Sequence, residues 1–324
     1  MTRSDLFVNL VKANSQGDQA AFRRTLEAII AEERAKQHHI LADRLAHFLN
    51  DNGYPKNRVN GISNQQVANF IYEITPQRAL KDLILPDVVL EDCRELIEEH
   101  QRKELLRSYN IEPRHRVLLV GPPGNGKTSL AEALAFELML PMFVIRYEGV
   151  IGSYLGETAN RVRTLLDYIR IHQCILFLDE FDTLAKERGD IHETGEIKRV
   201  VSSLLLQLDS LPSHVLVITA TNHPELLDRA VWRRFQLRLT LPRPSKSMIE
   251  KWFQSFQERI NEPLGYTPGF MAKEFVGNSY AELEEFCNDI CRRRILTVSS
   301  VSLQHNVDVK LKQWALRAKP QKLS

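Results

Sequence analysis

The chain alternates between short apolar runs and longer segments in which apolar residues recur every three or four positions. Apolar runs of the first kind predict four buried strands, at Val117–Val120, Met142–Ile145, Ile175–Leu178 and Val215–Thr219. Amphipathic segments between them predict helices near 128–139, 158–170 and 195–209. Strands that alternate with helices indicate a parallel sheet with helices on both faces. The predicted fold class is therefore α/β.

Helical patterns flank this α/β segment on both sides. Residues 4–50 carry apolar stripes, among them Phe22, Leu26, Ile29 and Ile30, and a turn-rich segment with glycine and proline follows. Residues 245–317 are helical in pattern again, after two closely spaced prolines. We therefore predict a helical N-terminal region over 1–78, an α/β domain over 79–242 and a helical domain over 243–324.

Composition and charge restrict the classes of partner. With 43% hydrophobic and 26% charged residues the chain is typical of globular proteins, and a formal net charge of +2 gives no electrostatic case for nucleic acid or a membrane as an obligatory partner. No apolar run reaches the roughly 18 residues of a membrane span, and the N-terminus lacks a signal-peptide pattern, so we expect no membrane anchor. The four cysteines have neither metal-ligand nor disulfide-framework spacing, which favours the cytoplasm.

The strongest chemical motif follows the first predicted strand. The residues Gly121, Pro122, Pro123, Gly124, Asn125, Gly126, Lys127 and Thr128 match G-x-x-x-x-G-K-[ST] and are followed by Ser129. Backbone N–H groups of such a loop surround phosphates, and the N-terminus of the next helix favours their negative charge. We expect Lys127 to contact the β- and γ-phosphates of ATP and Thr128 to be a ligand of Mg²⁺.

An acidic pair ends the third predicted strand. Asp179 and Glu180 follow an apolar run, and the phosphate loop requires such a partner. Asp179 is expected to hold Mg²⁺ and Glu180 to polarise the attacking water, although an acidic pair at a strand end can also be a solvated edge. A switch that never hydrolyses ATP could dispense with the glutamate, so we expect hydrolysis.

These motifs together resemble those of the AAA ATPases, over about residues 80–300. Gly-Pro-Pro-Gly-Asn-Gly-Lys-Thr resembles the phosphate loop of the family and Asp-Glu-Phe-Asp at 179–182 its Mg²⁺ strand. Asn222, in Thr-Ala-Thr-Asn, resembles the polar sensor that orients the attacking water; on sequence alone it could be a turn residue before Pro224. The resemblance implies a P-loop NTPase sheet flanked by helices and a small helical lid, and Gly277–Leu283 resembles the start of the lid helix that closes over the nucleotide.

Arg233 and Arg234 lie in a segment similar to the one that ends in arginine fingers. The resemblance implies that they reach the γ-phosphate of a neighbouring subunit, and hence a ring-forming homo-oligomer, usually a hexamer. Without the family, two adjacent arginines are more often a solvated surface. Many relatives have a basic residue three positions after Arg234, where this chain has Leu237 followed by Arg238, so the identity of the second finger stays open.

Tyr154 and Leu155 resemble the loop that lines the central pore of protein-remodelling relatives. A tyrosine offers a flat amphipathic surface that grips a polypeptide with little sequence preference, but it could also simply pack at a helix start. A second polar loop near 187–194 could also face the pore, and Arg199 matches an arginine that touches the adjacent subunit in relatives.

Three uses of the ATP follow from these patterns. The first is remodelling or unfolding of a protein substrate through a ring pore, for a separately encoded partner such as a protease. The second is a clamp or loader on nucleic acid, which the near-neutral charge disfavours. The third is an assembly switch that displays the N-terminal helices to a partner protein. Tyr154 and Leu155 favour the first.

Overall fold

The computed structural model describes residues 25–31, 67–150, 155–181, 204–227, 229–297 and 302–317. The chain divides into two units, residues 1–62 and 63–324. In the first unit, residues 25–31 form a helix in which Leu26, Ile29 and Ile30 are buried, as the apolar stripe predicts. The remainder of the predicted N-terminal helices lies outside the described residues.

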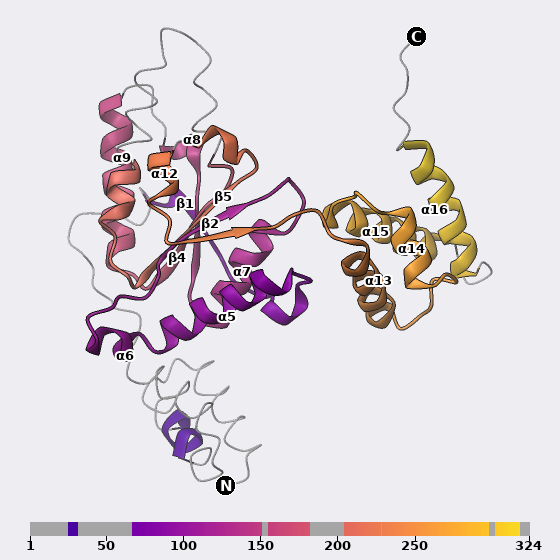
Figure 1. Ribbon diagram of the computed structural model, residues 1–324, viewed down its shortest axis with the longest axis horizontal. Coiled ribbons are helices and arrows are strands. Elements are labelled where there is room, and N and C mark those ends of the chain that lie inside the picture. The colour runs from indigo at the N-terminus through magenta and orange to yellow at the C-terminus, as the bar shows by residue number, and fades with distance from the viewer. Residues whose placement is uncertain are drawn as a thin grey trace. The chain divides into compact units, whose positions relative to one another are not determined.

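The second unit contains a mixed sheet (Figure 1), which in the described residues has six strands in the order β1-β3-β4-β5-β2-β6. β1 pairs antiparallel with β3, and every other neighbouring pair among these strands is parallel. The strands are β1 (Ile71–Ile74), β2 (Arg116–Val120), β3 (Met142–Ile145), β4 (Cys174–Leu178), β5 (Val215–Thr221) and β6 (Leu237–Thr240).

Helices cover both faces of the sheet, which confirms the predicted α/β architecture. Side chains alternate between the two faces of a strand. On one face, residues such as Val117, Leu119 and Phe177 form a core with α5 (Asp87–Gln101) and α7 (Lys127–Leu138). The intervening side chains, such as Leu118 and Leu176, are also fully buried. On that second side of the sheet Figure 1 shows α9 (Leu155–Arg170) and α12 (Arg229–Trp232).

The four predicted strands occupy the centre of the sheet, and the two strands that were not predicted lie at its edges. β2, β3, β4 and β5 begin and end within two residues of the predicted limits, because fully buried strands are continuous apolar runs. β1, inside the region predicted to be helical, buries only Ile71, and in β6 buried and exposed positions alternate. Four-residue strands with so few buried positions give too short a pattern for prediction.

The chain enters the sheet through a close contact beside β3. The N–H of Arg146, just after β3, donates to the carbonyl of Phe70 at 2.7 Å. Gly149, in the short helix α8 (Tyr147–Val150), passes so near that a Cβ atom there would lie 2.0 Å from the carbonyl oxygen of Asn69. Only glycine fits at this position. The segment that precedes β1 is therefore packed against the chain that leaves β3.

The C-terminal part of this unit is a helical bundle with its own core. Phe253, Phe275 and Phe286 are fully buried in it, and Trp314 packs against the last two. Ser245, Thr267 and Ser279 cap three of the helices, each accepting a hydrogen bond from a backbone N–H in the first turn. The described helices of this part are α13 (Lys246–Ile260), α14 (Pro268–Glu274), α15 (Tyr280–Leu296) and α16 (Leu303–Arg317).

Candidate functional site

The glycine-rich loop has the strand–loop–helix context that its motif requires. It leaves β2 at Gly121 and enters α7 at Lys127. A Cβ atom at Gly121 would lie 2.1 Å from the carbonyl oxygen of Leu241, so no side chain fits there. Gly124 has a φ of +76°, which favours glycine, and its carbonyl accepts a hydrogen bond from the N–H of Ala281 at 3.0 Å. The loop is thus fixed by both the sheet and the lid helix α15.

Lys127 joins the ends of β2 and β5. Its side chain is 7% exposed, and its ammonium group donates to the carbonyl oxygens of Gly121 at 2.7 Å and Pro122 at 3.1 Å. It also donates to Oδ1 of Asn222, which directly follows β5. Because β2 and β5 are parallel neighbours, their carboxyl ends lie side by side and the two predicted site residues meet there. These hydrogen bonds fix the ammonium group beside the phosphate loop.

The acidic pair lies at the end of β4, beside the first turn of α7. The hydroxyl of Thr128 donates to Oδ2 of Asp179 at 2.9 Å, and Oδ1 of Asp179 accepts from the N–H of Glu180 at the same distance. Glu180 has a φ of +47°. This backbone conformation costs energy for a residue other than glycine, and it recurs at functional sites. Its side chain is exposed and lines the same cavity as Lys127.

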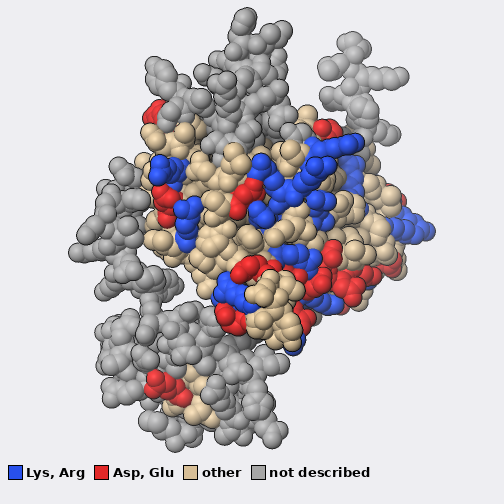
Figure 2. All heavy atoms as spheres, turned by 60° about the vertical axis from the view of Figure 1, so that its left-hand side comes forward, with Lys and Arg blue, Asp and Glu red and all other residues tan. Residues whose placement is uncertain are grey.

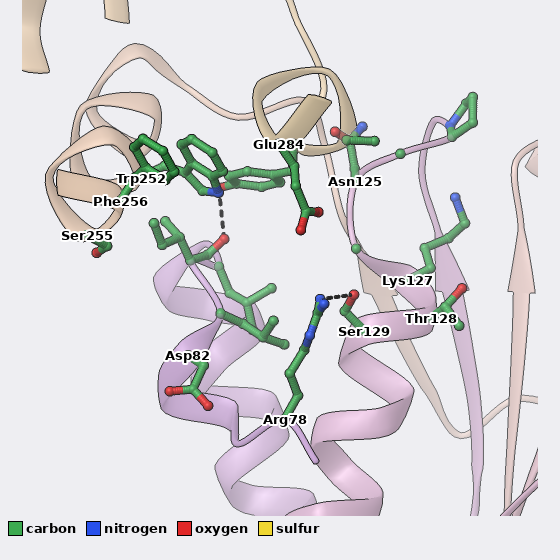
Figure 3. A pocket seen from close by; sticks show the side chains of 18 of the residues that line it. Arg78, Asp82, Asn125, Lys127, Thr128, Ser129, Trp252, Ser255, Phe256 and Glu284 are labelled. Carbon is green, nitrogen blue, oxygen red and sulfur yellow. Dashed lines mark hydrogen bonds between the residues drawn. The ribbon is translucent and has the colours of Figure 1, made fainter. Parts of the chain in front are cut away.

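These residues line one end of a cavity of about 760 Å³, a size typical of small-molecule sites. Its walls come from the phosphate loop, from the ends of β4 and β5, from the segment before α5 and from the lid helices α13 and α15. Figure 3 shows Lys127 and Thr128 on one side of this space and Trp252 and Phe256 on the other. The cavity therefore has a polar end and an aromatic end.

The aromatic end was not predicted from the sequence. Leu83, Ile84 and Leu85 line the same cavity as Phe256 and Tyr280. The Tyr280 hydroxyl donates to the carbonyl oxygen of Ile84 at 2.8 Å, and burial raises the pKa of this phenol, so it remains a donor at neutral pH. Apolar and aromatic walls beside backbone groups suit a heterocyclic base. No local sequence pattern predicts these walls, because apolar residues that line a cavity resemble those that fill a core.

The predicted finger arginines do not line this cavity. Arg233 is exposed just after α12, and its side chain has no ion pair or hydrogen bond with a described residue. Arg234 instead forms an ion pair with Asp209 of its own chain, and Asp209 also pairs with Arg116 at 2.9 Å. The guanidinium of Arg238 lies 5.8 Å from the ring centroid of Trp232. Of the three, only Arg233 lacks a partner in the described part of its own chain.

Three other predicted features, Tyr154, Arg199 and the polar loop at 187–194, lie outside the described residues. Leu155 is the first residue of α9, and no more than that is described for it. The described chain does show that the segment with Tyr154 connects α8 to α9.

The residues at the polar end fit a nucleotide with its magnesium ion. Mg²⁺ prefers oxygen ligands, and the Thr128 hydroxyl and the Asp179 carboxylate lie within hydrogen-bond distance of each other beside the phosphate loop. Oδ1 of Asn125, in the same loop, is buried without a hydrogen-bond partner among the described residues. The donor set and the glycine conformations are those that a phosphate chain requires.

Charges of both signs lie on the described surface. Figure 2 shows Lys and Arg side chains gathered in the upper part of its view, with acidic side chains among them and a band of acidic side chains below. On the face that this view shows, the basic side chains are interrupted by acidic ones, unlike the continuous basic stripe of a protein that follows a phosphate backbone. None of the described helices combines the length and the low polarity that crossing a bilayer requires.

Comparisons with known proteins agree with the geometry of the site. The family model described as "ATPase family associated with various cellular activities (AAA)" matches residues 117–243. The uncharacterized AAA family ATPase y4kL of Sinorhizobium fredii is 35% identical over 303 residues, which cover 91% of this chain and 90% of that protein.

Two further relatives are longer proteins. The cell division cycle protein 48 homolog of Archaeoglobus fulgidus is 32% identical, over 65% of this chain and 31% of its own length. The 26S proteasome regulatory subunit 8 homolog of Encephalitozoon cuniculi is 33% identical, over 63% of this chain and 54% of its own length.

The near full-length match to y4kL, the AAA match across the sheet and the P-loop NTPase architecture lead to the same conclusion. The chain belongs to the AAA ATPase family and is an ATP-binding, ATP-hydrolysing enzyme.

Proposed function

We propose that this ATPase assembles into a ring, a homohexamer, and uses ATP hydrolysis to remodel or unfold protein chains through a central pore. The observation that carries the proposal is the position of Arg233. It is exposed, outside the cavity of its own chain, and without a partner among the described residues. An arginine finger in this position acts on a nucleotide held by a neighbouring chain.

Within the site, the predicted residues have complementary roles. Lys127 binds the β- and γ-phosphates, and Thr128 and Asp179 hold Mg²⁺, which neutralises the charge that develops on the phosphates. Glu180 accepts a proton from the attacking water, and Asn222 orients that water while its Oδ1 holds Lys127. The aromatic end of the cavity binds the base. Ser129 and the backbone from Gly121 to Gly126 complete the phosphate cradle.

The substrate proposal rests on the relatives and on the sequence of the loop before α9. The relatives include a proteasome regulatory subunit homolog and a cell division cycle protein 48 homolog, and the segment that connects α8 to α9 carries Tyr154 and Leu155. We propose that this segment lines the pore and grips a polypeptide, that the enzyme serves a partner protein such as a separately encoded protease, and that it works in the cytoplasm.

The domain limits are part of the proposal. Residues 79–242 form the ATPase domain and residues 243–324 the lid, and the separate aromatic core of the lid supports this division. Residues 1–78 form the N-terminal region, which contributes β1 to the sheet.

Assembly is tested by light scattering on a chain that cannot hydrolyse its ATP. We expect Glu180→Gln, at a fixed concentration, to change on addition of Mg-ATP from a small species to a particle with a mass several times the 37.4 kDa of one chain. ATP that is bound but not hydrolysed keeps the sites between subunits filled, and binding at these sites favours the assembled form. The double variant Lys127→Ala with Glu180→Gln is the control and should stay small. A monomer under both conditions would contradict the ring and point to a switch that assembles only on a partner.

Threading is tested at Tyr154. We expect Tyr154→Ala to retain the basal ATPase rate but to lose the stimulation of that rate by an unfolded protein, with reduced and alkylated casein as the probe. The aromatic ring grips the polypeptide and takes no part in hydrolysis. Tyr109→Ala is the matched control, since this tyrosine is 73% exposed at the end of α6 (Lys103–Ser108). Equal casein stimulation of Tyr154→Ala and the parent would exclude the threading role of this residue.

A further inference from the structure

We propose that Arg78, together with Ser129, binds the α-phosphate of the nucleotide. The proposal rests on the proposed nucleotide site and adds a residue from outside its motifs. Arg78 precedes α5 and lines the cavity, and its Nη1 atom donates to Oγ of Ser129 at 2.8 Å. Ser129 directly follows Thr128 in the first turn of α7.

The position of Arg78 along the cavity identifies the group that it meets. Figure 3 shows its side chain rising between the helix that carries Lys127, Thr128 and Ser129 and the side occupied by Trp252 and Phe256. In a nucleoside triphosphate that spans the cavity, the base lies at the aromatic end and the β- and γ-phosphates at Lys127. The α-phosphate is the first anionic group between the two ends, and it is therefore the one beside Arg78.

The backbone on both sides of Arg78 is fixed to α7. The N–H of Gln77 donates to the carboxylate of Glu132 at 3.1 Å, and the N–H of Leu80 donates to that of Glu137 at the same distance. The side chains of Ala79 and Leu80 are buried. A guanidinium carried by an anchored backbone loses less freedom when it binds a ligand, so its position favours binding.

Arg78 and Ser129 keep donors available for a phosphate. A guanidinium has five N–H donors, and the hydrogen bond to Ser129 uses one of them. No described carboxylate forms an ion pair with Arg78. The Ser129 oxygen accepts from Arg78, so its own O–H can donate to a phosphate oxygen. The pair thus offers a charged fork and a hydroxyl to one anion.

The proposal is tested by calorimetric titration of ATP, ADP and AMP, with Mg²⁺, into Arg78→Ala made in the Glu180→Gln background. We expect the affinity to fall by the same factor for all three nucleotides, about tenfold, as for loss of a charge-assisted hydrogen bond. All three share the α-phosphate. Arg78→Lys should restore only part of the affinity, because lysine keeps the charge but lacks the fork. Ser129→Ala combined with Arg78→Ala should cost less than the sum of the two single changes.

Two controls distinguish phosphate binding by Arg78 from a general effect of removing a positive charge and from a loss of folding stability. Arg94→Ala removes one exposed arginine of α5 outside the cavity and should leave all three affinities unchanged. Arg78 is exposed, so the melting temperature of nucleotide-free Arg78→Ala should equal that of its parent. Unchanged affinities, a loss for ATP alone, or an equal loss in Arg94→Ala would each overturn the proposal. If the Glu180→Gln parent bound none of the nucleotides, the nucleotide site itself would be wrong.

Discussion

Glu180→Gln should lower the rate of ATP hydrolysis by about 10²–10⁴-fold, the range for loss of a general base. Glutamine keeps the size of the side chain and removes the carboxylate that accepts the proton of the attacking water. The groups that hold the phosphates and the metal, Lys127, Thr128 and Asp179, are unchanged, and the hydrogen bond from Thr128 to Asp179 does not involve the Glu180 side chain. The affinity for ATP should therefore change little.

The measurement is steady-state phosphate release under saturating Mg-ATP, with ATP affinity determined separately. Glu91→Gln, at an exposed position of α5, is the matched control and should hydrolyse at the parental rate. A Glu180→Gln chain that still hydrolyses ATP at the parental rate would show that another group activates the water.

Arg233→Ala should lower the rate by about 10³-fold or more, the effect typical of an arginine finger, and leave the affinity of the single chain for ATP unchanged. The side chain is exposed and outside its own cavity, so in the proposed ring its loss would act through the neighbouring subunit. Arg229→Ala, an exposed arginine of α12, is the control and should be close to the parent. Arg234 is less suitable for this test, because its substitution also removes the ion pair with Asp209.

Mixing two inactive chains gives the sharper form of this test. A Glu180→Gln chain keeps Arg233, and an Arg233→Ala chain keeps Glu180. Where a Glu180→Gln chain lies beside an Arg233→Ala chain in a mixed ring, one site combines Glu180 of one chain with Arg233 of the other. We therefore expect the hydrolysis rate of the mixture to rise well above that of either variant alone. No recovery on mixing, when light scattering shows mixed assemblies, would mean that Arg233 acts within its own chain or not at all.

The polar end of the site could be predicted because its signals are local. Gly121 to Thr128 are consecutive, the pair Asp179 and Glu180 follows β4, and Asn222 directly follows β5. Parallel strands then bring these ends together without further information. The central strands were predicted for a similar reason, since burial on both faces makes them uniformly apolar.

The remaining parts depend on tertiary contacts that leave no local pattern. The aromatic end combines Ile84 with Phe256 and Tyr280, which are far away in sequence. Arg78 is an isolated arginine in the sequence, and its contact with Ser129 depends on backbone bonds to α7. The ion pair of Arg234 with Asp209 likewise joins residues 25 positions apart.

The antiparallel pairing of β1 with β3 also determines where the described chain enters the sheet. The residues just before β1 lie at the sheet edge beside β3, where the N–H of Arg146 donates to the carbonyl of Phe70 and Gly149 passes Asn69. The chain that leaves β3 runs on through α8 to Tyr154. In the proposed pore mechanism, the loop that grips a polypeptide therefore follows the strand beside which the chain enters the sheet, while the phosphate loop follows β2, nearer the opposite edge. A change of the sequence ahead of β1 should therefore leave the nucleotide site intact.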